Sequence, residues 1–96
     1  MGSSQNAPTK DYYKNEAVPA APDWLHLDMG GTMSHIMILN RGSSDLVFSF
    51  DKGQNIHGSI TVLDGGEVRD DISHKHISIQ AAGAGGIVQI EAWRSS

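Results

Sequence analysis

The sequence contains no cysteine, and this absence excludes three kinds of chemistry. Disulfide bonds, thiolate zinc sites and cysteine nucleophiles all require that residue. With 96 residues the chain is long enough for one domain, and a chain this short buries only ~60% of the surface that it exposes when unfolded. Small domains without disulfides often complete their core with a partner subunit. We therefore expect one small domain that forms a homo-oligomer.

Positive charge and long apolar runs are also scarce. Seven lysine and arginine residues stand against eleven aspartate and glutamate residues, which gives a formal net charge of −4 with neutral histidines. Nucleic-acid-binding surfaces are basic, and a membrane-spanning helix needs ~20 apolar residues in a row. Residues 1–10 lack the charged start and apolar centre of a signal peptide. The sequence thus predicts no nucleic-acid partner and no membrane partner.

Proline is absent from most of the chain. Pro8, Pro19 and Pro22 all precede residue 23, whereas all nine isoleucines lie from Ile36 onward. Residues 1–31 show neither the period of a strand nor that of a helix, and proline favours extended backbone. We therefore interpret residues 1–31 as an extended N-terminal arm and residues 32–96 as the folded domain.

The arm nevertheless carries apolar side chains, namely Tyr12, Tyr13, Trp24, Leu25 and Leu27. One interpretation is an edge strand or flap that covers the core of its own domain. The other is a segment that docks on a neighbouring subunit, because aromatic residues supply large contact areas at low entropic cost. We take these five as candidate partner-binding residues. On this hypothesis, deletion of residues 1–21 leaves the domain folded but weakens assembly.

The rest of the chain reads as a series of strands. Residues 33–39 form an apolar run typical of a strand covered on both faces, and residues 46–50, 59–63 and 87–93 alternate with a period of two. Residues 68–80 change parity, which predicts a bulge near Ser73. Turns rich in Gly, Asn, Asp and Ser separate these segments, and we interpret the glycine-rich residues 81–86 as a hairpin tip. The pattern predicts an all-β fold, a small antiparallel β-sandwich or partly open barrel.

Candidate chemistry is limited to histidines. His74 and His76 would share one face of a strand, which is how a metal site can begin, and Asp70 could add a carboxylate. The chain has no Gly-x-Ser-x-Gly elbow, and its glycine-rich stretch lacks the lysine of a phosphate-binding loop. We therefore expect no catalytic residue, no metal and no cofactor. A small metal-dependent β-barrel enzyme using these three residues is the least favoured alternative.

Four segments between Ile38 and Trp93 carry a resemblance to a known family. They are residues 40–51 (Asn-Arg-Gly-Ser-Ser-Asp-Leu-Val-Phe-Ser-Phe-Asp), residues 60–67 (Ile-Thr-Val-Leu-Asp-Gly-Gly-Glu), Ile77-Ser78-Ile79 and the closing Ile90-Glu91-Ala92-Trp93. Together they resemble the small β-sandwich virion structural proteins of tailed bacteriophages. The resemblance implies a non-enzymatic protein that is assembled in the host cytoplasm and located in the virion. It would attach to the major capsid protein or to another protein of a head, neck or tail surface, as a decoration or minor structural component.

The main alternative is a stand-alone binding module of the β-sandwich type that recognises a sugar or a peptide. Such a module needs an exposed aromatic platform with hydrogen-bonding neighbours. Trp93, flanked by Gln89, Glu91 and Arg94, is the candidate for this platform.

Overall fold

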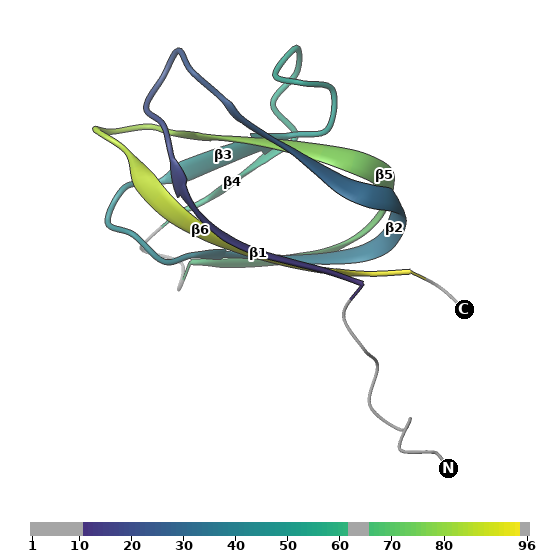
Figure 1. The fold of residues 1–96 in the computed structure, drawn as a ribbon. Helices are drawn as coiled ribbons and strands as arrows, with labels where there is room; N and C mark the ends of the chain where they lie inside the picture. The colour runs from purple at the N-terminus through teal and green to yellow at the C-terminus, as the bar shows by residue number, and fades with distance from the viewer. Residues whose placement is uncertain (1–10, 62–65, 95–96) are drawn as a thin grey trace.

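The computed structural model describes residues 11–61 and 66–94, which form an all-β fold (Figure 1). Its strands are β1 (Tyr12–Val18), β2 (Leu25–Asn40), β3 (Leu46–Ser49), β4 (Gly58–Ile60), β5 (Glu67–Ala81) and β6 (Gly86–Trp93). The described residues contain no helix, and hence none that could cross a membrane. The predicted all-β class is confirmed. Of the expected strand at residues 59–63 only the start is seen, because residues 62–65 lie outside the described part of the chain.

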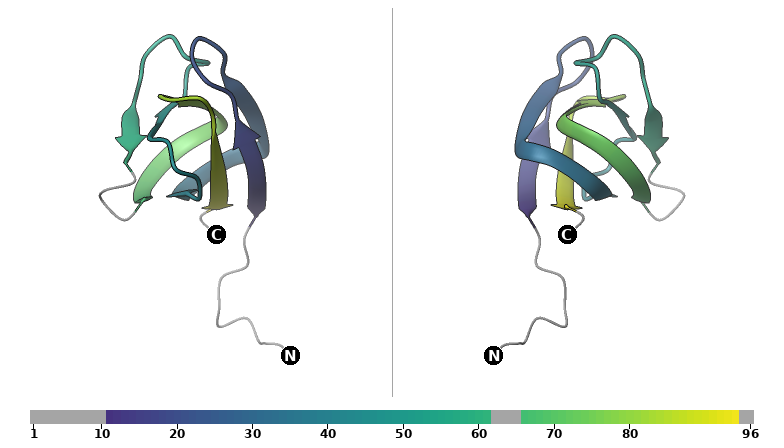
Figure 2. Two further views of the ribbon diagram at one scale, coloured as in Figure 1. Left: turned by 90° about the vertical axis from the view of Figure 1, so that its left-hand side faces the viewer. Right: turned by 90° about the vertical axis from the view of Figure 1, so that its right-hand side faces the viewer.

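All strands belong to one sheet with the order β1-β6-β2-β5-β3-β4, and all neighbouring strands are antiparallel. Strands β2 and β5 are long, with 16 and 15 residues. The second half of β2 lies between β6 and the first half of β5. The first half of β2 pairs with the end of β5, which on its other side pairs with β3, and β3 in turn pairs with β4. The two long strands bend, so the sheet folds over its own core without closing into a barrel (Figure 2).

Irregular pairing marks the bend in both long strands. Between the pairs Met33–His74 and His35–Asp71, β2 advances by two residues and β5 by three. The extra residue of β5 lies beside Ser73, so the predicted bulge is confirmed. A second register shift follows Asp28 in β2 and includes Gly30, whose φ of +85° is a conformation that glycine adopts without steric cost.

The inner surface of the folded sheet forms one hydrophobic core. Leu46, Phe48 and Ile60 point into it, as the alternation of their segments predicts. The buried residues that pack together in this core are Val18, Leu27, Met29, Met33, Ile36, Ile38, Leu46, Phe48, Ile60, Ile77, Ile79, Ala81, Val88, Ile90 and Ala92. Every buried side-chain nitrogen or oxygen in the described residues has a hydrogen-bond partner, as expected of a well-packed interior.

Residues 11–31 are part of this sheet. Strand β1 pairs with β6 over its whole length, and the start of β2 pairs with β5 from Leu25 to Asp28. The boundary that we expected at residues 31 and 32 therefore falls inside β2, and this part of the proposed arm is an edge strand followed by a core strand. The composition concealed β1 because Lys14 and Glu16 occupy its inner face and remain exposed at the sheet edge. Residues 1–10 of the proposed arm lie outside the described part of the chain.

The glycine-rich residues after β5 do not form a hairpin tip, so that prediction is wrong. Strands β5 and β6 are not neighbours, because β2 lies between them. The connection crosses one end of the sheet instead. Here a Cβ atom on Gly86 would lie 2.9 Å from Cδ2 of Leu46, so the crossing backbone lies directly on a core side chain.

Candidate functional site

Three of the five candidate partner-binding residues support the core of their own domain. Tyr12 and Leu25 pack against the core and Leu27 is buried in it. Burial raises the pKa of the Tyr12 hydroxyl above its usual value. Tyr13 lies on the opposite face of β1 and keeps 50% of its surface exposed. Of these four residues, Tyr13 is therefore the one whose side chain is largely exposed.

Trp24 joins the start of β2 to the loop between β3 and β4. A Cβ atom on Gly53, which has a φ of +90°, would lie 2.8 Å from Cε2 of Trp24, so the indole ring rests on the loop backbone. Asp51 holds this loop in shape. Its carboxylate accepts hydrogen bonds from the Ser49 hydroxyl at 2.6 Å and from the backbone N–H of Asn55 at 2.9 Å. These bonds, that of Ser49 first, lower the pKa of Asp51 to about 2.

Side chains of four strands meet on the side of the sheet opposite the core. We define the outer face as this surface over β1, β6, the second half of β2 and the first half of β5. Strand pairing aligns its side chains in rows. One row contains Trp93, His35 and Asp71, and the next contains Tyr13, Glu91, Met37 and Arg69. Residues far apart in the sequence thus become neighbours on one surface.

The outer face contains a hollow of about 360 Å³. Its lining includes Trp93, His35, Met37, Arg69 and Asp71. The hollow is open to solvent, since the Asp71 side chain is 89% exposed. It therefore offers an aromatic ring and both signs of charge to whatever contacts the surface, whereas Met37 is buried.

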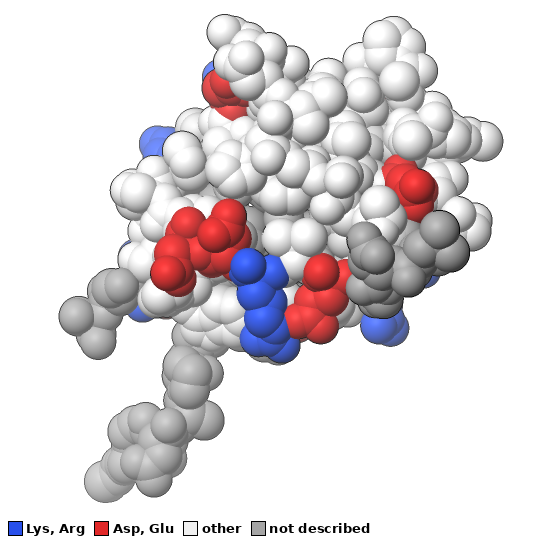
Figure 3. Space-filling view, turned by 180° about the vertical axis from the view of Figure 1, so that it is seen from behind, with Lys and Arg blue, Asp and Glu red and all other residues white. Residues whose placement is uncertain are grey.

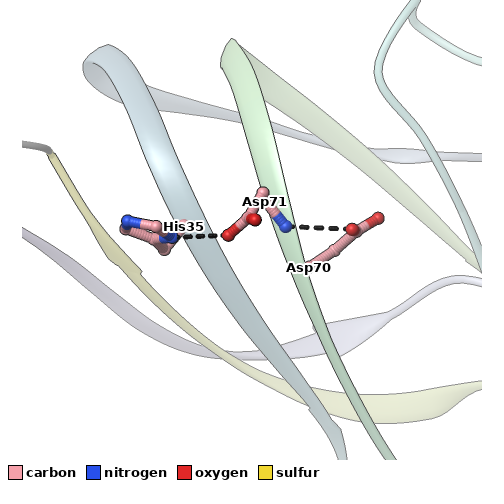
Figure 4. Close-up of polar contacts among 3 residues, drawn as sticks. All are labelled: His35, Asp70 and Asp71. Atoms are coloured by element: carbon pink, nitrogen blue, oxygen red, sulfur yellow. Dashed lines mark hydrogen bonds and ion pairs between the residues drawn. The ribbon is translucent and has the colours of Figure 1, made fainter.

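A short polar chain crosses the edge of this hollow (Figure 4). Nδ1 of His35 lies 2.7 Å from Oδ1 of Asp71, and the backbone N–H of Asp71 donates to Oδ1 of Asp70 at 2.9 Å. Asp70 also approaches His57, with 3.4 Å between its Oδ2 and the histidine Nε2. The two adjacent carboxylates thus contact different histidines.

Acidic side chains outnumber basic ones in the chain, but the two signs are interleaved on the surface (Figure 3). Seen from behind, acidic side chains form separate groups along the lower part of the molecule, with a basic side chain between two of them (Figure 3). On the outer face itself, Arg69 forms an ion pair with Glu67. The interleaved charges favour a partner with mixed charges over a strongly anionic polymer.

The histidine pair is divided between two partners. The His74 ring stacks on Phe50, with centroids 4.3 Å apart and an interplanar angle of 8°. His76 instead places its Nε2 3.4 Å from Oδ2 of Asp28, whose pKa is lowered mainly by a hydrogen bond from the backbone N–H of Gly30. In residues 11–61 and 66–94 no three side chains of metal-binding type form a group. This arrangement gives the metal-dependent enzyme hypothesis no support.

Two further hollows lie around the histidines. One of about 330 Å³ is lined by His26, Asp28, Lys52, His76 and Ser78. Within it, Nδ1 of His26 lies 2.6 Å from Oγ of Ser78, and this hydrogen bond satisfies a serine that is buried. The other, of about 260 Å³, lies beside Phe50 and the exposed Ile56.

Sequence reasoning found Trp93 and two residues of its face, but it also named Arg94 and missed the residues of the neighbouring strands. Gln89 and Glu91 are on the same face, where the Gln89 amide donates to the Glu91 carboxylate at 2.8 Å. The guanidinium of Arg94 lies against Gly31 instead. The residues that line the hollow with Trp93 come from β2 and β5, and only the strand order β6-β2-β5 identifies them.

Comparison of the chain with protein-family models, with curated proteins and with solved structures finds no match. The function is therefore argued from the surface chemistry and from the resemblance of the strand segments described above.

Proposed function

We propose that this protein is a non-enzymatic structural protein of a virion. It attaches to a capsid, neck or tail surface as a decoration or minor structural component, and it acts as a homo-oligomer. Its partner is the major capsid protein or another virion protein. The resemblance of residues 40–93 to small bacteriophage virion proteins suggests this role, and the chemistry of the outer face supports it.

The observation that carries the proposal is the residue content of the outer face. Trp93 and Arg69 line one open hollow together with Met37, which is itself buried. Tyr13 lies in the same row as Met37 and Arg69 but outside the hollow, on the other side of Glu91. Tyrosine, tryptophan and arginine contribute most of the binding energy in protein interfaces, and methionine is also enriched there. An open surface of this kind suits the docking of another protein surface better than it suits the enclosure of a substrate.

Repetition strengthens such attachment. A single small domain offers a limited contact area, so each copy binds weakly on its own. A symmetric particle presents many equivalent sites, and an oligomer that engages several of them gains avidity without new kinds of contact. Weak docking through the outer face is therefore sufficient for stable decoration.

Binding to particles tests the proposal. We expect Trp93→Ala and Arg69→Ala each to weaken co-sedimentation of the full chain with particles of the virus that encodes it by about tenfold or more, because truncation of an interface anchor costs ~1–4 kcal/mol. Ile56→Ala is the matched control, since it removes an exposed apolar side chain from the loop between β3 and β4. Wild-type protein that does not co-sediment with these particles would contradict the proposal.

One observation favours the sugar- or peptide-binding alternative. Trp93 lines the hollow together with His35, Arg69 and Asp71, which supplies hydrogen-bonding groups beside an aromatic ring. The Trp24→Phe variant leaves Trp93 as the sole tryptophan, so its fluorescence reports on the hollow. A saturable change in Trp93 fluorescence on addition of soluble oligosaccharides would favour this alternative over particle attachment, provided that Asp71→Asn abolishes the change.

A further inference from the structure

Strand β1 forms one edge of the sheet. It runs beside β6 (Figures 1 and 2), and no strand of residues 11–61 or 66–94 lies along its other side between Tyr12 and Val18. The middle of the strand is accessible on both faces. Lys14 and Glu16 share the inner face with the buried Val18, yet their side chains are 45% and 39% exposed. Such an edge is a template to which another strand can add.

The charges on this edge are arranged around Asn15. Charged residues on an edge strand usually prevent pairing with other chains. Here the two charges have opposite signs, and they lie on the same face, one residue to either side of Asn15. Within one copy Nζ of Lys14 lies 3.9 Å from Oε2 of Glu16, and both side chains stay exposed enough to meet a second strand. Antiparallel pairing centred on Asn15 places Lys14 opposite Glu16 of a second copy, and Glu16 opposite its Lys14. Centring on Lys14 or on Glu16 instead places like charges opposite each other, which is destabilising.

The remaining residues of β1 fit the same register. Pairing centred on Asn15 places Tyr12 opposite Val18 of the second copy and Tyr13 opposite its Ala17. Residues directly opposite each other in an antiparallel pair share a face, so a large side chain meets a smaller one on each face. The sequence of this edge is therefore complementary to itself in one register.

We propose that two copies of this chain pair through β1, antiparallel and about a two-fold axis at Asn15, so that one sheet continues through both. The inference deepens the homo-oligomeric part of the proposed function, whereas attachment through the outer face does not depend on it. Because the axis is perpendicular to the sheet, the outer faces of both copies lie on the same side. The dimer thus presents two docking surfaces in the same direction, the arrangement that gives avidity on a particle.

Charge exchange tests the pairing. In sedimentation velocity over a concentration series, we expect the full chain to dimerise. Lys14→Glu or Glu16→Lys should each weaken dimerisation by about tenfold or more, because each single change creates two like-charge contacts per dimer. An equimolar mixture of the two variants restores opposite charges at both contacts, so it should form a heterodimer as stable as the wild-type dimer. Lys75→Glu on β5 is the control for Lys14→Glu, because it makes the same change in net charge.

Cysteine cross-linking tests the register, because the chain has no cysteine of its own. Two copies of Asn15 directly opposite each other would have Cβ atoms about 4.5–5.5 Å apart, close enough for a disulfide after a small adjustment. We expect Asn15→Cys to form disulfide-linked dimers under mild oxidation. Ala17→Cys is the matched control, since it is exposed on the same face of β1 but lies roughly 13 Å from its own copy in this register.

Three results would overturn the inference: a wild-type chain that stays monomeric over the series, a variant mixture that does not recover dimerisation, or equal cross-linking of the two cysteine variants. Thermal melts of each variant exclude loss of folding as the cause. If dimerisation fails while Trp93→Ala still weakens particle binding, the attachment proposal stands without the dimer.

Discussion

At the residue scale, Asp51 shows how one side chain fixes a loop. It accepts hydrogen bonds from the Ser49 hydroxyl and from Asn55, and the backbone N–H groups of Asp51 and Gly53 in turn donate to the Ser49 oxygen. The loop held in this way supports the Trp24 ring on Gly53. A residue that we first assigned to partner binding is thus used to hold its own loop.

The depressed pKa of Asp51 makes a testable link between stability and pH. Its pKa falls from 3.8 to about 2 on folding, so the carboxylate contributes stability that is present above pH 3.8 and is lost as the pH falls toward 2. We expect Asp51→Asn to be less stable than wild type in urea unfolding at pH 7. The difference between their free energies of unfolding should become smaller below pH 3.8. Asp23→Asn, which removes another exposed carboxylate, controls for net charge. A gap that stays constant from pH 7 to pH 2 would contradict this role.

At the element scale, the sequence identifies strands but not their partners. Alternation correctly places Leu46, Phe48 and Ile60 inside, and the change of parity in β5 correctly indicates a bulge beside Ser73. Alternation assigns a face to each residue but carries no information about which strand lies next to it. The separation of β5 from β6 by β2 and the row of Trp93, His35 and Asp71 both depend on strand order, so neither could be predicted.

An edge strand was one of the two interpretations of residues 1–31, but alternation did not identify β1, for a related reason. At a sheet edge the inner face is only partly covered, so Lys14 and Glu16 can occupy inward positions and the alternation disappears. Composition therefore made the segment resemble a linker. Two prolines, Pro19 and Pro22, follow the strand at once and strengthened that impression.

The place of β1 in the sheet reverses the expected effect of truncation. Deletion of residues 1–21 removes the pairing partner of β6 and the buried Val18. We expect a loss of about 3 kcal/mol or more in the free energy of unfolding, because burial of one valine alone is worth ~1.5–3 kcal/mol. Circular dichroism melts would show this as a lower midpoint or as no cooperative transition. Deletion of residues 1–10 alone leaves β1 intact and is the comparison; a 22–96 fragment that melts like the full chain would contradict the assignment.

At the scale of the whole molecule, one folded sheet separates two tasks. The inner surface holds the core, and the outer face presents Tyr13, Trp93 and Arg69 away from it. A substitution on the outer face can therefore change binding without removing core contacts. This separation suits a protein whose proposed role is attachment, since its surface can vary while its fold is retained.

Attachment of the protein to the particle through its outer face is the central prediction. Hydroxyl-radical footprinting of the full chain, free and bound to purified particles, measures the solvent access of individual side chains. We predict that labelling of Tyr13 and Trp93 falls on binding, while labelling of Ile56, on the loop between β3 and β4, stays as in the free chain. Unchanged labelling of Tyr13 and Trp93 on bound protein would contradict attachment through the outer face.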